Sequence, residues 1–296
     1  MPLLLAQSNP TSGLLPALVT AASMALACAV LSVFVVSRRW AFIGEGIAHS
    51  GFGGAGTVWL LSLAFPALAE HGEWAPYAGV VVFCVLTALG IGFFTRSGQV
   101  NSDAVIGIFL VASLAWGILA QSIFRYVRLG QEPPGWDTFL FGRMDVSASF
   151  AIGAAMLCAA VVAVVVLLGK EILSYCLDPT TAQASGVPVG FIHYLLMVLV
   201  ALTIVIGVRL AGNVLVTALL VLPGATALIL CKSLVPAILA SLVIALAGTL
   251  GGIAIHFHWM FLPTGPAIVL LLFGQFLLAY GWGKIAEAPL GSKRAR

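Results

Sequence analysis

Long apolar segments separated by short polar breaks run along almost the whole chain. Each segment reaches or exceeds the roughly 17–20 residues that an α-helix needs to cross the hydrocarbon core of a bilayer. This pattern predicts an all-α, polytopic integral membrane protein with nine transmembrane helices, at residues 14–37, 41–65, 76–95, 104–124, 147–168, 191–208, 212–231, 234–256 and 264–283.

Two of the predicted boundaries rest on very few basic residues. Only Arg38 and Arg39 separate the first two segments, which could be re-entrant or strongly tilted instead of spanning fully. Arg209 alone separates 191–208 from 212–231. Eight transmembrane helices are therefore also possible.

The composition supports a membrane protein. Apolar residues make up 61% of the 296 residues, and charged residues only 8%, about a third of the ~25% found in soluble domains. A soluble fold of this size could not bury so much apolar surface. The net charge of +3 is too small to indicate nucleic-acid binding, and the scattered cysteines, with no Cys-x-x-Cys pair, indicate neither a disulfide framework nor a thiolate metal site.

Basic residues in the loops predict the orientation in the cell membrane. With the N-terminus outside and the C-terminus in the cytoplasm, most of the 13 lysines and arginines lie inside. The inside set is Arg38, Arg39, Arg96, Lys170, Lys232, Lys284, Lys293, Arg294 and Arg296, and the outside set is Arg125, Arg128, Arg143 and Arg209. We therefore expect one transmembrane domain over residues 1–284 and a cytoplasmic basic tail over 285–296. The N-terminus has no basic region, so no cleaved signal peptide is expected.

Glu45 and His49 place an acid and an imidazole four residues apart, well inside the second predicted span. Four residues is about one helical turn, so both side chains share a face. Ionisable groups within a span are costly and therefore indicate function, and a carboxylate with an imidazole suits divalent metal ions. His49 lies ten residues after Arg39, which is about 15 Å along a helix, or half of a ~30 Å hydrocarbon core.

Three interpretations of this pair remain open. The two side chains could form an internal hydrogen bond that locks helix packing, or Glu45 could carry protons in a proton- or cation-coupled secondary transporter. The favoured interpretation is a cation site on a permeation path. One Glu and one His are too few ligands, but two copies across a dimer axis would supply two of each, with a charge of −2 that neutralises a divalent cation.

Several other residues are weaker candidates. Small residues every four positions, which allow close helix approach, and a proline–glycine pair within a span indicate packing or hinges: Gly46, Ser50, Gly54, Pro223 and Gly224. His256 and His258 alternate as in a short extended stretch at an outer span end and could hold a metal transiently. His193, near a cytoplasmic span end, is expected at the surface. The pattern Gly51-x-Gly53-x-x-Gly56 lacks a preceding strand, so no nucleotide site and no enzymatic activity are predicted for the chain.

The polar break between Lys170 and Gly190 predicts a short amphipathic helix at the cytoplasmic face. Asp178 can cap this helix, with Pro179 at its first position. Gly186 and Pro188 then end it, after about two turns.

Six stretches together carry a family resemblance that covers roughly residues 30–275. They are Arg38-Arg39-x5-Glu45-x3-His49, Asp103-Ala-Val-Ile-Gly107, Leu140-Phe141-Gly142, Asp178-Pro179-x2-Ala182-x3-Gly186-Val-Pro188, Gly212-x2-Leu215-Val-x-Ala218-Leu-Leu-Val-Leu-Pro223-Gly-Ala-Thr-Ala227 and Leu262-Pro-x-Gly265-Pro-x-Ile268-Val. The chain resembles the membrane permease subunit of zinc, manganese and iron ABC uptake transporters, and Glu45 stands where that family usually has Asp.

The resemblance implies a homodimer of permeases in membrane lipid, cytoplasmic ATP-binding subunits, and an extracytoplasmic protein that delivers the metal. The transported ion would be zinc, manganese or ferrous iron, with no permanently bound cofactor. The resemblance also assigns contact with the ATPase to the coupling-helix region 170–190, through Asp178, Pro179, Ala182, Gly186 and Pro188. His with a carboxylate suits all three metals, so the sequence does not select among them.

Overall fold

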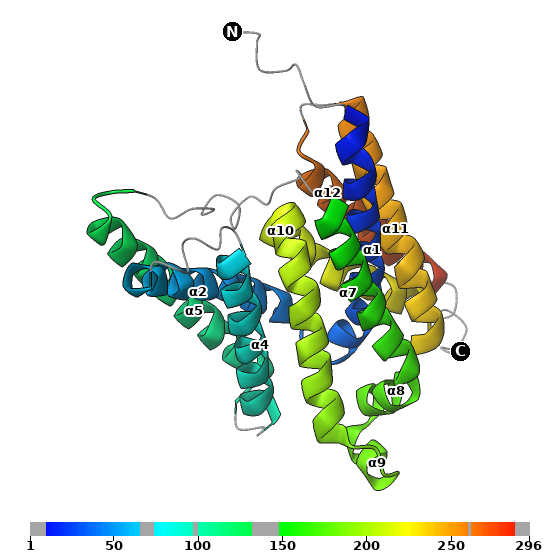
Figure 1. The fold of residues 1–296 in the computed structure, drawn as a ribbon. Helices are drawn as coiled ribbons and strands as arrows, with labels where there is room; N and C mark the ends of the chain where they lie inside the picture. Colours follow the sequence, from blue (N-terminus) through cyan, green and yellow to red (C-terminus); the bar gives the residue numbers. More distant parts are fainter. Residues whose placement is uncertain (1–9, 66–73, 97–99, 132–147, 260–261, 288–296) are drawn as a thin grey trace, which may run out of the picture.

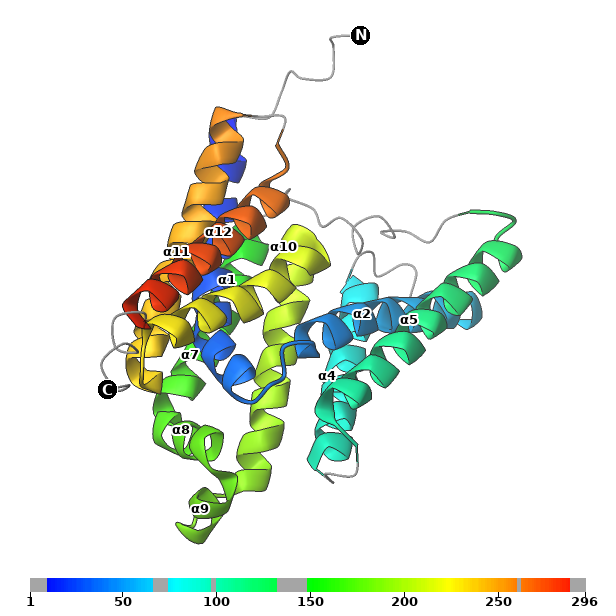
Figure 2. The same ribbon diagram turned by 180° about the vertical axis from the view of Figure 1, so that it is seen from behind.

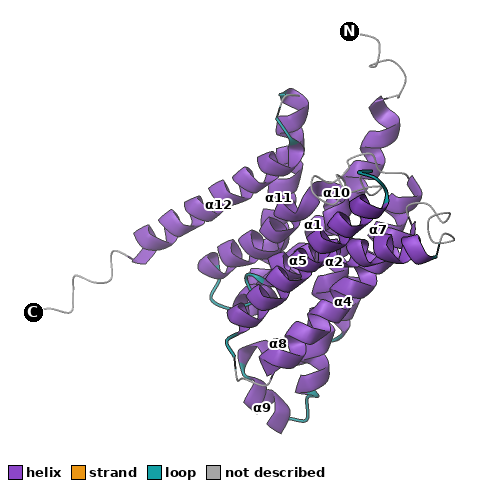
Figure 3. Ribbon diagram, turned by 90° about the vertical axis from the view of Figure 1, so that its left-hand side faces the viewer, coloured by secondary structure: helices purple, strands orange, loops and turns teal. Residues whose placement is uncertain are grey.

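The computed structural model describes residues 10–65, 74–96, 100–131, 148–259 and 262–287, and these residues form helices and connecting turns without a strand (Figures 1 and 3). The Leu140-Phe141-Gly142 stretch and most of the predicted basic tail lie outside these residues. The helices are α1 (Pro10–Ser37), α2 (Ile43–Ala64), α4 (Trp74–Arg96), α5 (Ser102–Val127), α7 (Ala148–Leu167), α8 (Gly169–Leu177), α9 (Pro179–Ala184), α10 (Val189–Leu230), α11 (Leu234–His258) and α12 (Thr264–Glu287).

Seven of the described helical segments are long and apolar enough to cross a membrane. They are Leu18–Ser37, Tyr77–Arg96, Ser102–Val127, Ala148–Leu167, Val189–Val208, Leu234–His258 and Thr264–Lys284. Each coincides with a predicted span, so the all-helical polytopic fold is confirmed. The predicted spans 41–65 and 212–231 are not among these seven segments. The first corresponds to α2, which is rich in glycine, and the second corresponds to Val214–Leu230, which is shorter than the seven.

α10 combines the two predicted spans on either side of Arg209 in one bent helix. A Cβ atom added to Gly207 would collide with the side chain of Val216. Nine residues of straight helix would separate these positions by about 13 Å, so the helix must turn back on itself between them. Figure 2 shows the second half of α10 running away from the first at a steep angle.

A Schellman motif ends α1 and redirects the chain into α2. The amide of Trp40 donates to the Val35 carbonyl at 2.9 Å, and the amide of Arg39 donates to the Val36 carbonyl at 3.0 Å. Arg39 takes the left-handed conformation, with φ 58°, at the position where glycine is usual. α2 then leaves α1 at a steep angle (Figure 2), so distance along α2 overstates depth in the membrane.

α1 lies in the interior and packs against α7, α10 and α11. Polar groups tie it to its neighbours. The amide of Gly224 donates to Ser32 Oγ at 2.7 Å, and Ser241 Oγ donates to the Ala29 carbonyl at 2.9 Å. A Cβ atom on Gly224 would lie 2.5 Å from the carbonyl carbon of Ser32. The Pro223-Gly224 pair is thus a point of close contact between α10 and α1.

We expect Gly224→Ala to destabilise the protein by about 1–3 kcal/mol, because the new methyl group meets backbone atoms that cannot move aside locally. Thermal unfolding in detergent would measure the loss. Gly274→Ala on α12 is the matched control, because a Cβ there meets nothing within 4 Å. Equal melting temperatures for Gly224→Ala and the unaltered protein would contradict this packing.

Candidate metal-ion site

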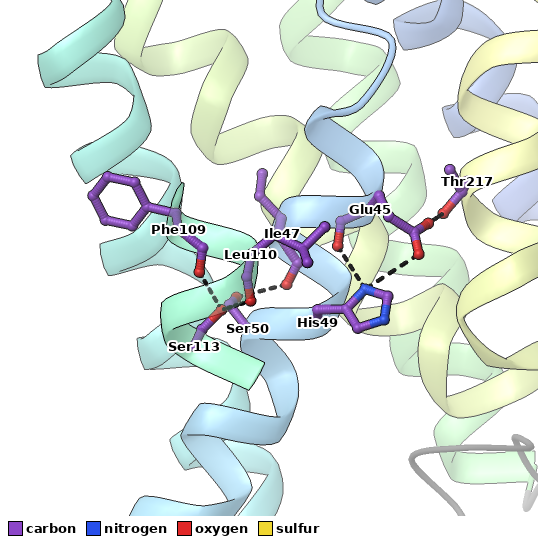
Figure 4. Close-up of polar contacts among 8 residues, drawn as sticks. All are labelled: Glu45, Ile47, His49, Ser50, Phe109, Leu110, Ser113 and Thr217. Carbon is purple, nitrogen blue, oxygen red and sulfur yellow. Dashed lines mark hydrogen bonds and ion pairs between the residues drawn. The ribbon is translucent and has the colours of Figure 1, made fainter. Parts of the chain in front are cut away.

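Glu45 and His49 lie one turn apart on α2, as predicted. His49 Nδ1 is 3.0 Å from the Glu45 carbonyl oxygen and 3.3 Å from Glu45 Oε1 (Figure 4). Both oxygens can only accept, so in the neutral imidazole Nδ1 carries the hydrogen and the lone pair is on Nε2. A histidine whose one nitrogen donates to a carboxylate or carbonyl while the other binds metal is the usual arrangement in metal sites.

Thr217, on the second half of α10, adds a third polar group that the sequence analysis missed. Its hydroxyl donates to Glu45 Oε2 at 3.1 Å, so the carboxylate is held by α2 on one oxygen and by α10 on the other. Figure 4 shows Glu45 pointing from α2 toward Thr217. The signal in the sequence was a lone hydroxyl in the apolar run from Val214 to Leu222.

One chain provides only part of a metal site. Among the described residues, no three His, Cys, Asp or Glu side chains come close enough to hold a metal ion together. The side chains of Glu45 and His49 are 35% and 21% exposed, so both remain reachable from the surface of the chain. Metal ions in proteins usually take four to six ligands, so a complete site needs ligands from elsewhere.

The other side of α2 packs closely against neighbouring helices. A Cβ on Gly46 would lie 2.8 Å from Ile106 Cγ2 of α5, and a Cβ on Gly54 would lie 2.6 Å from the Gly79 carbonyl oxygen of α4. Ser50 is buried and donates to the Ile47 carbonyl at 2.6 Å. These small residues let α4 and α5 approach α2 on the side away from Glu45.

The structure gives His256 and His258 different surroundings. Both lie in the last turns of α11, not in the extended stretch that their spacing indicated, and residues two apart on a helix face different ways. His256 Nδ1 donates to the Leu262 carbonyl at 2.6 Å, whereas His258 is exposed beside the ring of Trp259. Neither belongs to a group of three metal-ligating residues within the described ranges.

The polar break between Lys170 and Gly190 contains two short helices. Asp178 caps α9 as predicted, accepting from the Thr180 amide at 2.9 Å and its hydroxyl at 2.6 Å. Hydrogen bonds from Thr180 and Thr181 lower the pKa of Asp178 to about 2, so the cap stays ionised at neutral pH. Gly186, with φ 84°, ends α9 in a second Schellman motif.

Two details of this region differ from the sequence-based expectation. The sequence did not predict α8, which precedes the capped helix. Ala182 is fully buried, so its side chain packs inside this chain, and the exposed positions of α9 include Thr181 and Ala184.

The expectation that His193 lies at the surface is wrong. Its side chain is only 6% exposed and is hydrogen-bonded to Tyr175 of α8 and to the Gly92 carbonyl of α4. The sequence placed His193 at a span end, where solvent is the default surrounding. It could not show that α4 and α8 cover that end.

A model of the ABC 3 transport family matches residues 11–282. The chain belongs to this family. It is therefore a multi-pass permease subunit in the cell membrane, and a separate partner chain hydrolyses ATP.

Several named relatives align with nearly the whole length of this chain. The manganese transport system membrane protein MntC of Halalkalibacterium halodurans is 32% identical over 274 residues, which are 89% of this chain and 85% of that protein. A probable iron transport system membrane protein of Haemophilus influenzae is 30% identical, covering 91% and 93%. The high-affinity zinc uptake system membrane protein ZnuB of the same organism is 25% identical, covering 90% and 96%.

The fold also matches a solved structure, PsaBC from Streptococcus pneumoniae in complex with Fab. The match has a TM-score of 0.72 and 27% sequence identity, and it covers 90% of this chain and 91% of that one. The helical arrangement described above is thus shared with this solved structure.

We expect Thr217→Ala to raise the metal concentration needed for half-maximal uptake by about ten- to 150-fold, because a hydrogen bond to a charged group contributes about 1.5–3 kcal/mol. Uptake of radioactive Mn²⁺ or Zn²⁺ into cells would measure the shift. Thr217→Ser keeps the hydroxyl and should restore the original value. An unchanged concentration dependence in Thr217→Ala would show that this hydroxyl does not position Glu45 for the metal.

Proposed function

We infer that the chain is the membrane-spanning subunit of an ATP-driven importer for a divalent transition metal ion. The observation that carries this function is the Glu45–His49–Thr217 arrangement, in which a carboxylate and an imidazole are held together within an apolar helical protein. Relatives named for manganese, iron and zinc transport support a metal as the transported substrate. The carboxylate and imidazole suit all three ions, so we leave the metal open among them.

Two copies of the chain would complete the site. Each would contribute Glu45 and His49, which gives two carboxylates and two imidazoles around one ion, with a charge of −2 on the ligands. The partial exposure of both side chains is consistent with a second copy facing them. We therefore propose a homodimer in which the ion passes between the two α2 helices.

The proposed orientation puts the N-terminus outside and α8–α9 in the cytoplasm. Arg38 and Arg96, at the ends of α1 and α4, both lie close to Tyr175 of α8, the helix that also carries Lys170. A concentration of basic residues at one face is typical of the cytoplasmic side. The nine predicted spans would then cross or enter the membrane, with α2 as an internal, tilted helix.

Transport would begin when an extracytoplasmic binding protein releases the ion at the outer mouth. Glu45 and His49 of both copies would receive it, with Thr217 orienting the carboxylate. ATP binding to the cytoplasmic subunits would displace α8–α9 and switch the site from outward to inward access. A secondary transporter that uses Glu45 as a proton carrier is not favoured, since the family consists of ABC transporters.

We expect Glu45→Gln and His49→Ala each to abolish uptake of Mn²⁺ and Zn²⁺ by the complete transporter in proteoliposomes, because each removes ligands and Glu45→Gln also removes the neutralising charge. The complex should assemble normally, as judged by co-purification of the ATPase. Asp103→Asn, at an exposed acid that opens α5, removes a charge elsewhere and should leave uptake in place. Full uptake by both site variants would remove Glu45 and His49 from the transport path.

We propose that the exposed side of α9 contacts the ATP-binding subunit. Thr181 and Ala184 lie on that side, so Thr181→Lys and Ala184→Glu should lower the amount of co-purified ATPase by about tenfold or more, because an unpaired charge in an interface costs several kcal/mol. Ala184→Ser is the matched control, with nearly the same volume and no charge. Undiminished ATPase recovery from both charged variants would refute this contact.

A further inference from the structure

A buried polar cluster joins α8 to α4 and α10. The Tyr175 hydroxyl lies 2.7 Å from His193 Nδ1, and His193 Nε2 lies 3.0 Å from the Gly92 carbonyl oxygen. Since a carbonyl can only accept, Nε2 carries the hydrogen, and in the neutral ring Nδ1 accepts from the Tyr175 hydroxyl. Tyr175 is 2% exposed and His193 6%, so water does not compete for these bonds.

Arg38, the residue that follows α1, completes the cluster. Its guanidinium carbon is 4.4 Å from the centre of the Tyr175 ring and 5.6 Å from that of Trp40. The buried Arg38 Nε atom has no hydrogen-bond partner within the described part of the chain. Arg38 is held by cation–π contacts with these two rings and by a side-chain hydrogen bond with Tyr175, and its planar guanidinium can also stack on an aromatic face, which an ammonium cannot.

The phenol of Tyr175 remains a hydrogen-bond donor at any physiological pH. Burial raises its pKa to about 12, although the nearby Arg38 opposes the shift. The Ile172 side chain of α8 is also fully buried. Its packing is apolar and has no preferred direction. The Tyr175–His193 bond is thus a directional contact that helps to fix the position of α8.

The cluster also reaches the chain segment that carries the metal site. The Trp40 ring packs edge-on against the His193 ring, with centroids 5.3 Å apart. Trp40 precedes Glu45 by five residues, in the turn that leads into α2. α8 is thereby linked to the start of α2 through two side-chain contacts, Tyr175 with His193 and His193 with Trp40.

We propose that Arg38, Tyr175 and His193 are positioning residues that transmit displacement of α8–α9 to α2, and so couple ATP hydrolysis to the opening of the Glu45–His49 site. This inference rests on the proposed transport function. Moving α8 alone would leave the buried His193 Nδ1 unsatisfied, at a cost of about 1–3 kcal/mol. We therefore expect α8, α10, α4 and the turn between α1 and α2, which meet in the cluster, to move together, as packed contacts with discrete arrangements do.

The test is Tyr175→Phe, which removes only the hydroxyl and keeps the ring beneath Arg38. The complete transporter, with its ATPase and binding protein in proteoliposomes, is assayed for Mn²⁺ transported per ATP hydrolysed. We expect this ratio to fall about two- to tenfold, the factor that one buried hydrogen bond represents. Assembly and Mn²⁺ affinity should not change, whereas the melting temperature should fall by a few degrees, because the buried His193 Nδ1 loses its donor. Tyr280→Phe, at an exposed tyrosine of α12, is the matched control and should keep the full ratio.

An unchanged ratio in Tyr175→Phe, alongside loss of uptake in Glu45→Gln, would overturn the coupling role and leave the transport function standing. Full uptake in Glu45→Gln would instead overturn the transport site itself. If Tyr175→Phe does not assemble, Arg38→Lys takes its place, because it keeps the charge and loses the planar stacking. The same fall in the ratio then supports the proposal, and an unchanged ratio refutes it.

Discussion

Keeping a carboxylate inside an apolar helical protein is the constraint on which the structure depends. Glu45 is stable there because His49 donates to one oxygen and Thr217 to the other. The Glu45 side chain is 35% exposed, and its hydrogen bond with Thr217 favours keeping α2 and the second half of α10 together. The bend in α10 makes this possible, because it returns the chain toward α2 after the first half has crossed the bundle.

The composition of α2 follows from its place in the interior. One side carries the polar pair, and the other carries Gly46, Ser50 and Gly54, which admit α4 and α5 at very short distances. A helix surrounded by protein does not need a strongly apolar surface facing lipid. This explains why α2 can hold ionisable groups.

The short helices α8 and α9 are built from local signals but anchored by contacts with other helices. Asp178 and Gly186 begin and end α9 through hydrogen bonds within a few residues. The attachment of α8, by contrast, depends on Tyr175 meeting His193, which meets Trp40. The turn containing Trp40 leads directly into α2, so the region proposed to contact the ATPase and the region proposed to bind metal share one set of contacts.

The sequence by itself determined the all-helical membrane fold, the capped helix α9 and the pairing of Glu45 with His49, because each follows from contacts within one helix or from the cost of polar groups in hydrocarbon. Tertiary structure alone decided that Thr217 reaches Glu45 and that His193 is buried. Thr217 is 172 positions from Glu45, and His193 is 101 positions from Gly92, and no local pattern encodes contacts between residues so far apart. The bend of α10 was likewise visible only as a weak break at Arg209, since its angle is set by the helices packed on either side.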